Sequence, residues 1–115
     1  MSARRHERRS PSALAARVRR ALMELTGGAG TVLSHKERAW SSITFVGTRH
    51  ELVLRFVGDE EVEAGEALID RLPEHEFALA GQLVAEAEVV ESAHFFDADH
   101  ERLTLRVVLL LLEES

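Results

Sequence analysis

The chain has 115 residues, 45% of them hydrophobic and 30% charged, which is the composition of one globular domain and excludes a disordered chain. It contains no cysteine, which excludes disulfides, thiolate zinc sites and thiol nucleophiles. Its longest apolar run, 107–112, is far shorter than the ~20 residues that cross a bilayer, so we expect a soluble, cytoplasmic protein without a membrane span.

Charge is distributed unevenly along the chain. Residues 1–20 contain seven arginines and one glutamate, whereas residues 21–115 sum to −12 and give the whole chain a net charge of −6. We predict that residues 1–10 form a basic flexible arm and that residues 11–115 form a single domain. An acidic body repels nucleic acid, so only the arm would attract phosphates. The arm residues concerned are Arg4, Arg5, Arg8 and Arg9.

The first half of the chain predicts one helix followed by a hairpin. Ser10-Pro11 is typical of a helix start, because serine caps free N–H groups and proline suits the first helical position. An apolar stripe at helical spacing follows, and Gly27-Gly28 ends the helix. The stripe consists of Leu14, Val18, Leu22 and Leu25. After a loop, we predict a strand at 40–46, a turn at 47–50 and a return strand at 51–57.

The second half predicts the same order of elements. Asp59 caps a second helix whose acidic first turn suits the helix dipole, and Pro73 ends it. The inner stripe of this helix is Val62, Gly65, Leu68, Ile69 and Leu72. Strands are predicted at 82–96 and 102–113, joined by a turn. Leu83, Ala85, Ala87 and Val89 are expected to share one face of the first strand, and a loss of alternation near Val90 indicates a bulge.

The two halves partly repeat. Shifted by 50 residues, 42–51 matches 92–101 at several positions, and after one inserted residue 52–57 matches 103–108. The prediction is therefore an α+β fold in which two α-β-β units form a four-stranded antiparallel sheet with two helices packed on one face. In this repeat His50 corresponds to His100, so the two imidazoles either approach each other or point separately to solvent.

The apolar pattern of the last predicted strand indicates how the domain associates. Leu103, Leu105, Val107, Leu109 and Leu111 mark its core face. Val108, Leu110 and Leu112 make the opposite face apolar as well, and a strand that is apolar on both sides is normally buried on both. We expect a homodimer that forms through this second face. The alternative is that the segment around Trp40 shields it within the chain.

Three functional hypotheses follow. The first is a non-catalytic interaction or assembly domain, with a protein partner or a second copy and no cofactor, because no paired catalytic groups are evident. The second is a small enzyme or ligand-binding module with a pocket that uses His50, His94 or His100. The third is nucleic-acid binding through the arm, although such arms also serve as solubilising tails.

One polar cluster has residue types that ligate metals, although turn geometry scatters such side chains over both faces. This cluster is His94, Asp97, Asp99 and His100. In outline, a small acidic α/β dimer also resembles the secretion chaperones that bind extended segments of effector proteins. That resemblance concerns the fold alone, without a shared motif, and implies a protein-binding role.

Overall fold

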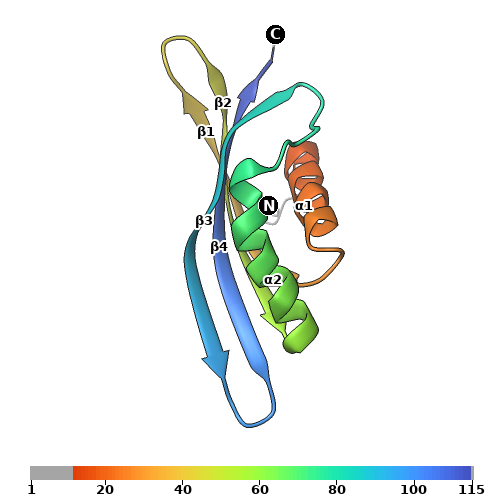
Figure 1. Cartoon of the computed structure of the whole chain (residues 1–115). Coiled ribbons are helices and arrows are strands. Elements are labelled where there is room, and N and C mark those ends of the chain that lie inside the picture. Colours follow the sequence, from red (N-terminus) through yellow and green to blue (C-terminus); the bar gives the residue numbers. More distant parts are fainter. Residues whose placement is uncertain (1–11, 115) are drawn as a thin grey trace, which may run out of the picture.

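The computed structural model describes residues 12–114, and its elements follow the order α-β-β-α-β-β (Figure 1). They are α1 (Ala13–Leu25), β1 (Thr31–Ser41), β2 (Val46–Val57), α2 (Asp59–Arg71), the 3-10 helix η2 (Leu72–Glu74), β3 (Gln82–Phe96) and β4 (Glu101–Glu113). The four strands form one antiparallel sheet in the order β1-β2-β4-β3, and both helices lie on the same side of it (Figure 1). The predicted fold is confirmed.

The core lies between the helices and the two central strands. From His50 to Phe56 on β2 and from Leu103 to Leu111 on β4, every second side chain points towards the helices and is buried, as the pleat of a strand requires. The buried cluster includes Leu52, Leu54 and Phe56 of β2, Leu103, Leu105, Val107, Leu109 and Leu111 of β4, Val18 and Leu22 of α1, and Val62 and Leu68 of α2. The predicted core face of the last strand is thus confirmed. Within residues 12–114, no helix is long and apolar enough to span a bilayer.

The first helix begins two residues later than predicted. Its cap is Ser12, whose Oγ accepts the N–H of Ala15 at 2.9 Å. Serine is preferred there because its side chain satisfies one of the free N–H groups of the first turn. Ser10 and Pro11, the predicted start, lie outside the described residues.

The predicted boundaries of the first hairpin are wrong. The turn lies at 42–45, where Ser42 Oγ accepts the N–H groups of Thr44 at 3.3 Å and Phe45 at 3.1 Å. Residues 31–36, predicted as a loop, belong to β1, and residues 47–50, predicted as the turn, belong to β2. β1 is an edge strand with mostly exposed side chains, so it lacks the alternation by which a half-buried strand is recognised.

The third strand has the predicted bounds and two bulges. The register shifts between Val89 and Glu91, which confirms the predicted bulge near Val90. A second shift, between Val84 and Glu86, reverses the faces that follow it, so Leu83 lies on the side away from the helices while Ala87 and Val89 pack against the core. The expectation that Leu83 shares their face is therefore wrong.

The two halves share the order of their elements. However, no single shift in residue number superposes all the elements of one half on those of the other. The two helices start at Ala13 and Asp59, whereas the second strands of the two hairpins start at Val46 and Glu101. These two separations differ, so the predicted match of 42–51 with 92–101 lays a turn over a strand. The sequence identity in that window does not correspond to structural equivalence.

Gly65 lies where α2 passes closest to the sheet. A methyl group at this position would lie 2.8 Å from Cδ1 of Phe56 and 2.9 Å from Cδ2 of Leu103, and both side chains are buried. We expect Gly65→Ala to lower the free energy of unfolding by about 1 kcal/mol, because overpacking costs about 2 kcal/mol and the helix preference of alanine recovers about 1. Urea unfolding measures this change. A more stable variant would contradict the close approach.

Candidate functional site

The sheet face opposite the helices is left uncovered by any helix or strand within residues 12–114 (Figure 1). We call it the open face. Strand register aligns its side chains in rows that cross the sheet from β1 through β2 and β4 to β3. The apolar row is Trp40, Gly47, Leu112 and Leu83; the upper charged row is Arg38, Arg49, Leu110 and Glu86; the lower charged row is Lys36, Glu51, Val108 and Glu88.

The three residues predicted to form an interface all lie on this face. Val108 is 4% exposed and Leu112 is 8% exposed, while Leu110 is half-buried. The apolar centre is therefore already covered more fully than its sequence suggests. Trp40 lies in the same row as Leu112, and Gly47 between them has no side chain to separate the two. This arrangement is compatible with the alternative expectation that Trp40 contributes shielding.

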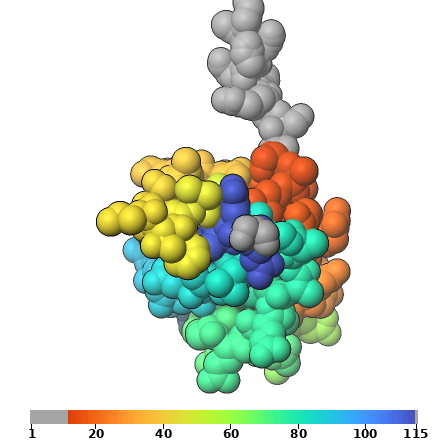
Figure 2. Space-filling model, turned by 90° about the horizontal axis from the view of Figure 1, so that it is seen from above, coloured from red at the N-terminus to blue at the C-terminus, as the bar shows by residue number. Residues whose placement is uncertain are grey.

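Exposed apolar side chains lie instead around the edge of the open face. Leu83, at the β3 end of the apolar row, is 50% exposed. Ile43 and Phe45 at the tip of the β1–β2 hairpin are exposed, and Ile43 is fully so. Seen from above, this hairpin projects from the body in yellow (Figure 2). Apolar side chains gathered in this way are typical of a surface that contacts a partner.

Charge divides the open face into two sides. Lys36, Arg38 and Arg49 give the β1–β2 side a positive charge, and Glu86 and Glu88 give the β3 side a negative one. Between the sides, Arg106 of β4 donates to Glu51 and to Glu91, each at 2.9 Å. Arg106 is thus neutralised within the chain, whereas the two flanking groups have no ion pair among residues 12–114.

A second polar feature lies on the opposite side of the sheet, under α1. His50 of β2 is fully buried, and its Nδ1 is 2.8 Å from Nε2 of His35 on β1. Nδ1 of His35 is 3.1 Å from Arg19 of α1, and Nε2 of His50 is 2.9 Å from Oγ1 of Thr48. The four side chains form one chain of hydrogen bonds that joins α1 to the first hairpin. Sequence reasoning missed it, because His50 was expected beside His100 or in solvent.

The direction of this chain follows from arginine, which can only donate. Nδ1 of His35 must accept from Arg19, so Nε2 of His35 carries the hydrogen and donates to His50. Nε2 of His50 in turn donates to Thr48. Burial, then His50 and Arg19, lower the pKa of His35 to about 4 against the opposing effect of Glu37. Burial also lowers the pKa of His50, again against Glu37. Both imidazoles are therefore neutral at pH 7.

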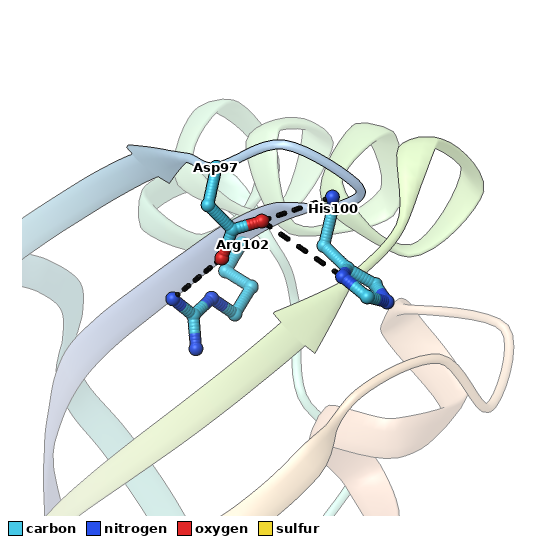
Figure 3. A network of polar contacts seen from close by, with 3 residues as sticks. All are labelled: Asp97, His100 and Arg102. Carbon is cyan, nitrogen blue, oxygen red and sulfur yellow. Dashed lines mark hydrogen bonds and ion pairs between the residues drawn. The ribbon is translucent and has the colours of Figure 1, made fainter.

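The residues proposed as metal ligands are spread over the β3–β4 hairpin. Asp97 Oδ1 accepts the backbone N–H of His100 at 3.0 Å and lies 3.8 Å from its Nδ1, while Oδ2 accepts from Arg102 at 3.0 Å (Figure 3). His94 instead pairs with Glu101 at 2.6 Å. Within residues 12–114, no three histidine or acidic side chains converge as a metal site would require. The Asp97 contacts are those of an Asp-stabilised turn.

The three histidines proposed for a pocket are not brought together. His50 is paired with Leu109 in the middle of the sheet, whereas His94 lies near the end of β3 and His100 in the turn beyond it. Two shallow depressions near α2 and the β3–β4 turn include His100, and neither includes His50 or His94. These two depressions therefore do not place two of the imidazoles around one substrate.

The basic segment at the start of the chain divides into two parts. Arg4, Arg5, Arg8 and Arg9 lie outside the described residues. Of the arginines on α1, Arg17 donates to the carbonyl of Ala80 at 2.8 Å and Arg19 donates to His35. Two of the seven arginines counted in the basic segment thus have structural contacts, which leaves fewer of them free for phosphate.

Searches of protein-family models and of curated proteins found no match to this chain. Among solved structures, the chain is similar to a chain of the virion of a native gene transfer agent (GTA) particle, with a TM-score of 0.58. The match covers 93% of this chain and 90% of the other, and the two sequences are 16% identical. At that identity the likeness establishes a common fold.

Proposed function

We propose that this protein is a non-catalytic structural subunit that assembles with further copies of itself through the open face of its sheet. The observation that carries the proposal is the uncovered four-stranded face, with half-buried Leu110 at its centre and exposed Leu83 at its edge. A sheet face of this kind is normally covered in the functional state. The likeness in fold to a chain of a virion, which is a multi-subunit particle, supports the same role.

Assembly of this kind is tested by sedimentation of the full chain over a range of concentrations. We expect the wild type to form an oligomer at micromolar concentration. Leu110→Lys should weaken that association at least about tenfold, because it places an unpaired positive charge beside Arg49 at the centre of the face that the second copy would cover. Thermal unfolding verifies that the variant remains folded.

The matched control is Ala67→Lys. Ala67 is partly exposed on α2, which lies on the other side of the sheet, so the same added charge there leaves the open face unchanged. We expect Ala67→Lys to associate as the wild type does. A wild type that remains monomeric at high concentration would contradict the proposed function, and equal weakening by the two variants would show that the contact does not involve the open face.

A further inference from the structure

Three cations crowd together on one side of the open face. Lys36, Arg38 and Arg49 line a small depression of about 90 Å³ together with Glu51. Arg38 and Arg49 are direct partners in the register of β1 and β2. Like charges placed opposite each other on neighbouring strands destabilise a sheet. Glu51, the carboxylate in this depression, is already bonded to Arg106, and none of the three cations has an ion pair within the described part of the chain.

Two carboxylates without an ion pair in the described residues lie on the other side of the same face. Glu86 and Glu88 of β3 are exposed and have no ion pair among residues 12–114. Register places Glu86 in the row of Arg38 and Arg49, and Glu88 in the row of Lys36. Within one copy, β2 and β4 separate the two groups, so they cannot neutralise each other directly.

We propose that the cluster of Lys36, Arg38 and Arg49 is the binding site for the carboxylates of Glu86 and Glu88 on a second copy of the chain. The proposal rests on the proposed self-association and identifies the contacts that fix how the two copies are oriented. It requires that copies meet with the β1 side of one against the β3 side of the next.

A two-fold axis parallel to the strands satisfies this requirement. Such a rotation exchanges β1 with β3 and β2 with β4 and leaves every row at its own height. Arg38 then faces Glu86 of the second copy and Lys36 faces its Glu88, across the ~10 Å that separates packed sheets. The same rotation sets Trp40 over Leu83. A two-fold axis lying in the interface across the strands would instead set β1 on β1, with like charges opposed.

Phosphate of nucleic acid is the competing anion. The net charge of −12 over residues 21–115 disfavours nucleic acid, and the register that sets Glu86 and Glu88 in the rows of Arg38 and Lys36 favours the acidic strand of another copy.

The test uses two charge-reversed forms of the full chain, K36E/R38E and E86K/E88K. Each form alone sets like charges against each other, so we expect its self-association to weaken at least about tenfold relative to wild type. An equimolar mixture restores opposite charges at every contact, so we expect association within about threefold of wild type. Sedimentation velocity measures both, and raising the salt concentration should weaken the wild-type complex.

The matched control for E86K/E88K is E63K/D70K, which replaces the same number of carboxylates by lysines on the exposed side of α2 and should associate as the wild type does. Wild-type oligomers that persist in both reversed forms, or a mixture that fails to recover, would overturn the charge pairing and leave the proposed function intact. A monomeric wild type would overturn both. Loss of duplex DNA binding in K36E/R38E, with self-association unchanged, would assign the site to nucleic acid.

Discussion

Replacing Gly47 by alanine should destabilise the protein more than Gly65→Ala does. A Cβ at Gly47 would lie 1.9 Å from the carbonyl oxygen of Leu111 and 2.9 Å from Cα of Leu112. These are backbone atoms of the central strand β4, so they cannot move aside as a flexible side chain does. We expect Gly47→Ala to lower the free energy of unfolding by about 3 kcal/mol or more. Equilibrium unfolding in urea measures the loss.

The control for this prediction is Gly27→Ala. Gly27 has a positive φ of 69°, and a Cβ there would meet no atom within 4 Å. Its replacement isolates the backbone penalty of alanine in the left-handed region, about 1 kcal/mol. Gly47 carries no such penalty, so a loss well above that of Gly27→Ala reports the steric conflict. Equal losses in the two variants would show that β2 can move away from β4 at little cost.

Gly47 also shows which parts of the fold can be predicted from the sequence and which cannot. A glycine followed by Thr48 resembles a turn, and only the approach of Leu111 from the other half of the chain identifies it as a strand residue. Both helices and the second hairpin were predicted because each buries one face against the core, and that burial imposes a period on the sequence. The edge strand β1 buries little, so its sequence carries no such period.

The candidate site was predicted in part for the same reason. Val108, Leu110 and Leu112 were identified as the second apolar face because they alternate with core residues along one strand. The charged rows depend on register between strands that are far apart in sequence, as Arg38 and Glu86 are. Two bulges in β3 shift that register, and a sequence does not specify how many residues a bulge adds. The charge pattern of the open face therefore becomes visible only in three dimensions.

The second large effect is expected on acidification. In the unfolded chain a histidine has a pKa near 6.5. In the folded protein the pKa of His35 is lowered to about 4 and that of His50 is also lowered, so the unfolded state binds more protons between pH 6.5 and 4. The free energy of unfolding should therefore be highest above pH 6.5 and fall as the pH drops to about 4. Because His35 is only partly buried, we expect a loss of about 2 kcal/mol for the pair.

The physical cause is the direction of the hydrogen bonds from Arg19 to Thr48. Nδ1 of each imidazole already accepts a hydrogen bond, so a proton added there opposes the donor that faces it. The control is H35Q/H50Q, since each amide offers one acceptor and one donor in the same order but does not titrate. Unfolding of both proteins in urea from pH 7.5 to 4 separates this effect from that of the carboxylates. Parallel pH profiles for the two proteins would show that the imidazoles remain free to take up protons in the folded state, and the assigned hydrogen-bond chain would then be wrong.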